Sequence, residues 1–122
     1  MKTYNITLPY PTVTGNRAVR HGSGAHYLTK SASSYRAQVA QAARLHGVYE
    51  LKVHGPCSMH LTIVPPDKRR RDLDNLMKVV NDALLSAGVL TDDCGSVITN
   101  GSWQWAPADP GAPHVMLSIE VP

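Results

Sequence analysis

Two aspartates that lie one residue apart directly follow a run of four cations near the middle of the chain. A cationic run attracts an anionic polymer. Two close carboxylates repel each other, and a cation bound between them would remove that repulsion. Together the two features predict a phosphate backbone brought onto a bound divalent metal, which is the chemistry of a metal-dependent nuclease. The cations are Lys68, Arg69, Arg70 and Arg71, and the aspartates are Asp72 and Asp74.

A second acidic pair follows the helix that is predicted after these aspartates. Asp92 and Asp93 lie beyond a helical stretch of about 24 Å, at 1.5 Å per residue. A returning strand could bring one of them back beside Asp72 and Asp74. Mg²⁺ takes six oxygen ligands and usually keeps several waters, so two or three aspartates suffice. The spacing leaves open whether one metal ion or two would bind.

Lys78 lies four residues after Asp74, on the same face of the predicted helix. One interpretation is an ordinary acid–base pair on the helix surface, worth about 0.2–0.5 kcal/mol. The other is a cation that stabilises transition-state charge on the phosphate or orients water. Sequence spacing alone leaves both interpretations open.

A second basic segment precedes this region. Residues 11–30 are predicted to be a loop, because glycines interrupt the stretch and no apolar period survives. The segment is either a solvated surface loop or a second basic surface that contacts a phosphate backbone. Its candidate DNA-binding residues are Asn16, Arg17 and Arg20.

Apolar periodicity predicts six elements in the order strand, helix, strand, helix, strand, strand, which is an α+β fold with a small mixed sheet and two helices. Ser31 or Ser33 is expected to cap the first helix, and Asp72 or Asp74 the second. Residues 48–55 are read as a connection or a short edge strand. The strands are expected at 4–8, 57–64, 97–105 and 115–121, and the helices at 31–46 and 73–87.

The 122 residues fit one domain, and 43% of them are hydrophobic, which is enough for a core. Cys57 and Cys94 lack the short spacing of a zinc site, so we expect two free thiols in a reduced, cytoplasmic protein. No signal peptide is expected, and no apolar run approaches the roughly 20 residues of a membrane span.

The Asp-X-Asp pattern by itself leaves alternatives. Nucleotide-sugar transferases also use it to hold Mn²⁺ or Mg²⁺, although they need a longer α/β domain, and other metal-dependent phosphotransfer or hydrolysis enzymes share it. The chain could also be a basic nucleic-acid-binding domain without catalysis, in which the aspartates only cap a helix. Binding by such a domain would not depend on a divalent metal.

The block from Pro66 to Lys78 resembles the signature of the RusA-type Holliday junction resolvases, small metal-dependent endonucleases common in prophages. The similarity continues through residues 82–84 and 87–89 to Asp92 and Asp93. It includes the opening residues 4–9, and it is looser after residue 105. One segment departs from the family pattern, since residues 11–16 replace the usual Pro-Pro-Ser before the asparagine.

The resemblance implies that Asp72, Asp74 and Asp93 bind Mg²⁺ or Mn²⁺ and that Lys78 is the catalytic lysine. It also implies that Arg71 and the cations before it contact DNA, and that hydrolysis leaves a 5′-phosphate and a 3′-hydroxyl. The family is dimeric and cuts four-way junctions. The chain is therefore expected to form one domain over residues 1–122 and a two-fold dimer, joined through the apolar face of residues 115–121 or of the second helix.

Overall fold

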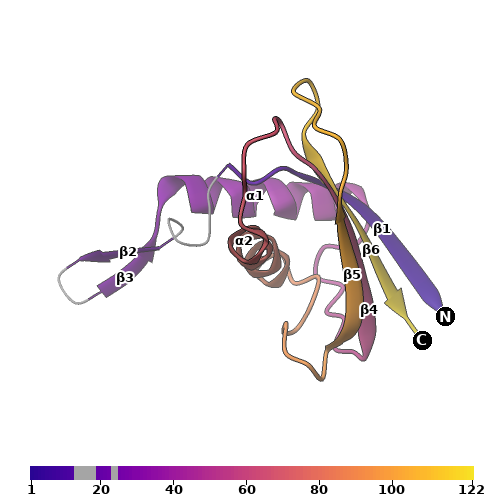
Figure 1. Ribbon diagram of the computed structural model, residues 1–122. Coiled ribbons are helices and arrows are strands. Elements are labelled where there is room, and N and C mark those ends of the chain that lie inside the picture. Colours follow the sequence, from indigo (N-terminus) through magenta and orange to yellow (C-terminus); the bar gives the residue numbers. More distant parts are fainter. Residues whose placement is uncertain (13–18, 23–24) are drawn as a thin grey trace.

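The computed structural model describes residues 1–12, 19–22 and 25–122. Two helices cover one face of a four-stranded sheet, and a small two-stranded sheet lies on the far side of the helices from the large sheet (Figure 1). The expected α+β class, with a mixed sheet and two helices, is confirmed.

The large sheet has the order β1-β6-β4-β5. Strand β6 (His114–Val121) runs antiparallel to both of its neighbours, β1 (Lys2–Pro9) and β4 (Cys57–Val64). Strand β5 (Ile98–Trp105) pairs with β4 in parallel and forms one edge. The four predicted strands are confirmed. Strands β1, β4 and β6 each bury one face and so carry a period of two in their sequence, whereas β5 is exposed along most of its length.

The core lies between the sheet and the helices. Alternate residues of β1, β4 and β6 point into it, whereas their neighbours face solvent on the uncovered face of the sheet. The central strand residues of this core are Ile6, Leu8, Met59, Leu61, Ile63, Val115, Leu117 and Ile119, each less than 5% exposed.

Helix α1 spans Lys30–Leu45. Its cap is Thr29, whose hydroxyl accepts from the Ala32 N–H at 3.3 Å, so the expectation of Ser31 or Ser33 was wrong. Thr29 is the residue with extended backbone immediately before the first turn, the geometry that an N-cap needs. The buried Tyr35 ties the helix to the sheet, since its hydroxyl donates to the Pro9 carbonyl at 2.8 Å. Burial raises the pKa of Tyr35 well above its usual range.

Helix α2 spans Leu73–Ser86 and connects the parallel strands β4 and β5. Its apolar stripe is buried as predicted, with Val80 and Leu84 fully enclosed. Gly88 follows the helix with a φ of +70°, a conformation that favours glycine, and it confirms the expected end of the helix. The loop between β4 and α2 carries the four cations.

The predicted loop over residues 11–30 was wrong at residues 19–22 and 25–28, whereas Pro11, Thr12 and Thr29 lie outside helices and strands. Strands β2 (Val19–Gly22) and β3 (Ala25–Leu28) pair antiparallel. Strands of four residues are too short for alternation to show in the sequence, and glycines obscure it further. Asn16 and Arg17 lie outside the described residues, and Arg20 lies on β2. Residues 48–55 form a connection, with one parallel bridge from Val53 to Leu90.

The proposed dimer surfaces were also wrong. Val115, Leu117 and Ile119 of β6 are buried in the core between the sheet and the helices, and the stripe of α2 packs on the same core. The apolar face of β6 and the apolar stripe of α2 are therefore both buried within one chain and cannot form the dimer interface. Cys57 and Cys94 are free thiols, as expected. Among the described residues, no helix is long and apolar enough to cross a membrane.

Candidate active site

Arg71 holds the cationic loop in shape. Its Nη1 donates to the carbonyl oxygens of Asp67 and Arg69, each at 2.9 Å, and its Nη2 donates to Asp67 Oδ1 at 2.7 Å. The guanidinium carbon lies 5.7 Å from the centre of the Tyr10 ring, and the side chain is only 20% exposed. Most of the donors of Arg71 are therefore used inside the protein.

Asp67 is the partner of this arginine, and its role was missed from the sequence. Its Oδ1 also accepts from the Arg69 N–H at 2.9 Å, which closes a tight turn at the start of the loop. These hydrogen bonds, first that of the Arg69 backbone and then that of the Arg71 side chain, hold the pKa of Asp67 below its usual range. The sequence did contain a signal that could have revealed this role: Asp67 lies two residues before the amide that it accepts from and four residues before the arginine.

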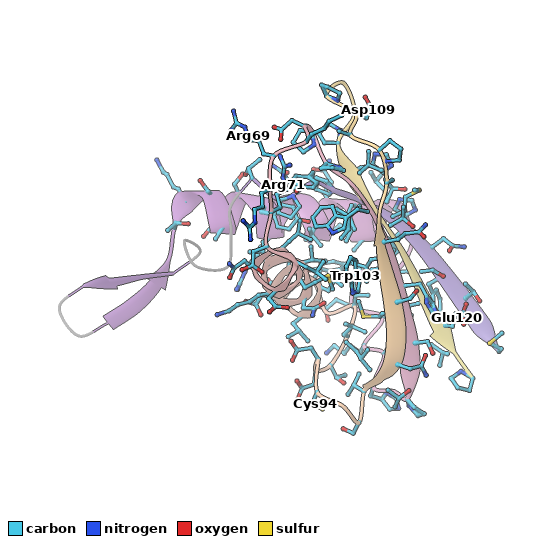
Figure 2. All side chains as sticks on the ribbon, in the orientation of Figure 1. Arg69, Arg71, Cys94, Trp103, Asp109 and Glu120 are labelled. Atoms are coloured by element: carbon cyan, nitrogen blue, oxygen red, sulfur yellow. The ribbon has the colours of Figure 1, made fainter. Side chains whose placement is uncertain are left out.

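The other three cations of the loop are exposed. The Arg69 side chain is 87% exposed, with its Nε at 3.9 Å from Asp67 Oδ2, and Lys68 and Arg70 lie on either side of it. Figure 2 shows Arg69 pointing away from the body of the protein and Arg71 turned back beside α2. The loop therefore presents Lys68, Arg69 and Arg70 to solvent, while Arg71 supports them from behind.

Asp72 and Asp74 lie where the loop becomes helix. Asp72 is the N-cap of α2: its Oδ1 accepts from the Asp74 N–H at 3.0 Å, and its Oδ2 accepts from Asn75 Nδ2 at 3.1 Å. Both aspartates are exposed at the helix terminus whose dipole favours negative charge. The capping interpretation of Asp72 is confirmed, and Asn75 joins the site by orienting its carboxylate.

Asp93 lies in the connection from α2 to β5, where its N–H donates to Asp92 Oδ1 at 2.7 Å. Within residues 1–12, 19–22 and 25–122, no three His, Cys, Asp or Glu residues form a group that could hold a metal ion. The structure therefore does not gather Asp93 into a cluster with Asp72 and Asp74. The ion pair expected between Asp74 and Lys78 is not among the ion pairs of the described residues. Lys78 is exposed on α2.

The donors at the start of α2 fit a hard divalent cation. Mg²⁺ is commonly bound by one or two carboxylates together with substrate phosphates and waters. Asp72 and Asp74 supply two exposed carboxylates, and each oxygen of Asp72 keeps a free lone pair beyond its present hydrogen bond. These two residues fit Mg²⁺ without a third carboxylate from the protein.

Two hollows flank the cationic loop. One, of about 660 Å³, lies toward the end of β1 and is lined by Tyr10, Pro11, Arg70 and Asp72 among others. The other, of about 460 Å³, lies toward the end of β5 and is lined by Lys68, Arg69 and Trp105 among others. Exposed cations therefore border both hollows, and the carboxylate that caps α2 borders the first.

The model of the family endodeoxyribonuclease RusA matches residues 9–116, which include the loop, α2 and Asp93. The chain belongs to the RusA family. It is 39% identical over 93 residues to the crossover junction endodeoxyribonuclease RusA of Escherichia coli strain K12, covering 76% of each protein. The same protein of Enterobacteria phage 82 is also 39% identical over 93 residues, with the same coverage, and that of Shigella sonnei is 38% identical.

The RusA relatives thus include a phage protein, as the resemblance led us to expect. A solved structure of a DegV family protein from Corynebacterium glutamicum aligns with 98% of this chain and 48% of its own, at 11% identity. Its TM-score is 0.35, and a likeness at that level carries no argument about fold or function.

Proposed function

We propose that this chain is a Mg²⁺-dependent DNA endonuclease that resolves four-way junctions by paired, symmetric phosphodiester hydrolysis. The observation that carries the proposal is the order of features at one junction of loop and helix. Three exposed cations lead directly to two exposed carboxylates at the N-terminus of α2. Membership of the RusA family and the names of its relatives support DNA as the polymer.

Lys68, Arg69 and Arg70 bind the phosphate backbone and draw the DNA toward the start of α2. Asp72 and Asp74 hold the Mg²⁺, for which Mn²⁺ substitutes, and Asn75 keeps the Asp72 carboxylate in place. When bound, the ion would activate water and neutralise charge on the phosphate. Each hydrolysis leaves a 5′-phosphate and a 3′-hydroxyl.

Lys78 and Asp93 complete the proposed site. Lys78 lies one helical turn after Asp74 on an exposed face and stabilises the negative charge that develops on the phosphate. Asp93 would serve as a further carboxylate ligand if the loop before β5 brought it to Asp72 and Asp74. Asn16, Arg17 and Arg20 add further contacts to the DNA.

The active form is a two-fold homodimer of one-domain chains over residues 1–122, acting in the cytoplasm, where the free thiols stay reduced. We place the interface on β5. This edge strand has eight residues, carries no charge, and is exposed from Thr99 to Trp105. Edge strands without charges or prolines are open to pairing. Two uncharged copies can pair antiparallel across a two-fold axis without like-charge repulsion.

The opposite edge of the sheet is less suited to pairing. Strand β1 carries Lys2, and its Thr7 N–H already donates to His46 Nε2 at 3.3 Å. Light scattering at micromolar concentration should give the mass of two chains. Asn100→Lys, which adds a charge to β5, should lower the mass toward one chain, whereas Thr3→Lys on β1 should leave it unchanged.

The deciding experiment compares a synthetic four-way junction with a linear duplex of the same sequence. Each DNA is incubated with the protein in Mg²⁺, in Mn²⁺ and in EDTA. We expect symmetric cuts in the junction with either metal and none with EDTA. Metal-independent junction binding without any cleavage would instead support a binding-only domain and would overturn the proposed function.

A further inference from the structure

The hollow between the cationic loop and the end of β5 has a mixed lining that the cleavage chemistry does not use. Lys68 and Arg69 border it on one side, and Trp105, Ala106 and Pro107 on the other. Its volume is about 460 Å³. Arg69 and the loop that carries Asp109 after β5 lie at the same end of the molecule (Figure 2). A cationic wall therefore faces an aromatic and apolar one.

Both walls of this hollow are held by hydrogen bonds. The Ala106 N–H donates to the Ile63 carbonyl and the Asp109 N–H to the Pro65 carbonyl, each at 2.8 Å. On the other wall, Arg71 fixes the loop through Asp67. The hollow is therefore formed before any ligand arrives, which lowers the entropy cost of binding.

Both tryptophans of the chain are exposed, and Trp105 is the one that lies beside the cations. It lies opposite Ile63 in the β4–β5 register, so both side chains point to the helix-covered face of the sheet. Ile63 is fully buried there, whereas Trp105 is 37% exposed. The chain has only two tryptophans and no phenylalanine. One of its few large aromatic rings is thus kept out of the core and beside two cations.

We propose that this hollow binds one unstacked nucleotide of DNA, with its base against Trp105 and its phosphate at Lys68 or Arg69. The proposal rests on the proposed function and deepens it. Aromatic stacking suits any base, because every base has a π-face, and the cations match the phosphate. The Asp67 carboxylate in the lining does not repel the phosphate strongly, because Arg71 neutralises it at 2.7 Å.

This site would favour branched DNA over linear duplex. In a duplex each base is paired and stacked, and taking it out costs a few kcal/mol. At the crossover of a junction, or in a single strand, a base is freer to leave the stack. The hollow would therefore let the protein prefer branched DNA over linear duplex without contacts that read the base sequence.

The test measures binding in EDTA, where cleavage does not interfere. Wild-type protein, Trp105→Ala, Trp105→Phe and Trp103→Ala are titrated with a four-way junction, a linear duplex and a single strand. Trp103 is the matched control: it is on the same strand and 52% exposed, but lines a different hollow. Because both tryptophans lie on the strand proposed to pair in the dimer, light scattering on each variant checks that its mass is that of the wild type. Trp105→Ala should weaken junction binding roughly 10-fold or more. Trp105→Phe should restore most of it, and duplex affinity should change little.

Fluorescence gives a second measurement that does not depend on affinity. Trp103→Phe leaves Trp105 as the only tryptophan, and Trp105→Phe leaves only Trp103. Junction DNA should quench Trp105 and leave Trp103 nearly unchanged. Quenching by the single strand as well would identify any unpaired nucleotide as the ligand, and quenching by the junction alone would identify the crossover.

Two results would overturn the proposal. The first is that Trp105→Ala binds the junction as tightly as the wild type does. The second is that Trp105→Ala loses affinity for the junction and for the linear duplex by the same factor. If wild-type protein cleaves junctions while Trp105→Ala changes nothing, the nucleotide site fails and the nuclease proposal stands. If Trp105 is quenched but no junction is ever cleaved, the nuclease proposal fails instead.

Discussion

The guanidinium of Arg71 donates a 2.7 Å hydrogen bond to the carboxylate of Asp67, at the opposite end of the cationic loop. The same guanidinium holds two backbone carbonyls of the loop. The last of four consecutive cations is thus part of the frame that positions the other three.

Removing either partner of this pair should weaken DNA binding through the loop shape. Arg71→Ala and Asp67→Ala should each reduce affinity for junction and duplex alike, and the double variant should do little further harm, because both remove the same interaction. A double-mutant cycle on junction affinity measures this. Fully additive losses would show that the two residues act independently.

The Arg71–Asp67 pair should also depend on pH in a defined direction. The pKa of Asp67 is lowered in the folded protein, so its contribution is complete above the ordinary value of 3.8 and is lost as pH falls through the lowered pKa. We expect loop order to be unchanged from neutral pH to about pH 4. Amide exchange or NMR shifts of Arg69 against pH report this, with Asp67→Asn as the control.

The exposed cations should carry the salt dependence of binding, and Arg71 should not. Ala substitution of Lys68, Arg69 or Arg70 should flatten the plot of log affinity against log salt concentration by about one unit per lost phosphate contact. Arg71→Ala should lower affinity with a nearly unchanged slope. A slope that drops with Arg71→Ala as much as with Arg69→Ala would mean that Arg71 reaches the phosphates itself.

The proposed metal ligands should be needed for cutting and dispensable for binding. Asp72→Asn, Asp74→Asn and Asp93→Asn should each nearly abolish junction cleavage in Mg²⁺. Junction affinity should be equal or higher, because negative charge facing phosphate is removed. Asn is also a good N-cap, so Asp72→Asn should keep α2 folded. A wild-type cleavage rate in any one variant removes that residue from the site. The test matters most for Asp93, because the structure does not group it with Asp72 and Asp74.

Lys78 should matter for rate and not for stability. Because it makes no ion pair with Asp74 in the described chain, Lys78→Ala should change the free energy of unfolding by less than about 0.5 kcal/mol. Its single-turnover cleavage rate at saturating enzyme should fall by orders of magnitude at unchanged affinity. An unchanged rate constant would leave Lys78 as an ordinary surface lysine.

A two-fold dimer should need two working sites. In a mixed dimer with one Asp72→Asn chain, one strand of a cruciform in a supercoiled plasmid should be nicked and the junction left unresolved. Nicked circles should therefore replace linear product. Linear product at the wild-type rate from the mixed dimer would contradict paired cleavage by two equivalent sites.

The sequence by itself determined the features that arise from local or periodic patterns. Strands β1, β4 and β6 and helix α2 were predictable because each buries one face, and burial on one face imposes a period of two or 3.6 residues. The placement of Asp72 and Asp74 at a helix start was also predictable, because an N-cap is satisfied by amides two or three residues away. The family signature added roles for Asp93 and Lys78 that spacing could not assign.

Tertiary structure decided the features that depend on what covers each side chain. In the sequence, Arg71 is the last of four equivalent cations. In the structure, its guanidinium donates to Asp67 and to backbone carbonyls of the loop. The alternation of β6 predicts a strand with one buried face, but the helices packed on that face are what bury Val115 and Ile119. Trp105 is a large aromatic residue, but it is the last residue of the edge strand β5, and its ring remains exposed beside Arg69. For the β6 residues and Trp105, coverage depends on chain segments distant in sequence, which no local pattern encodes. For Arg71 the partner is only four residues away, and the shape of the turn decides the contact.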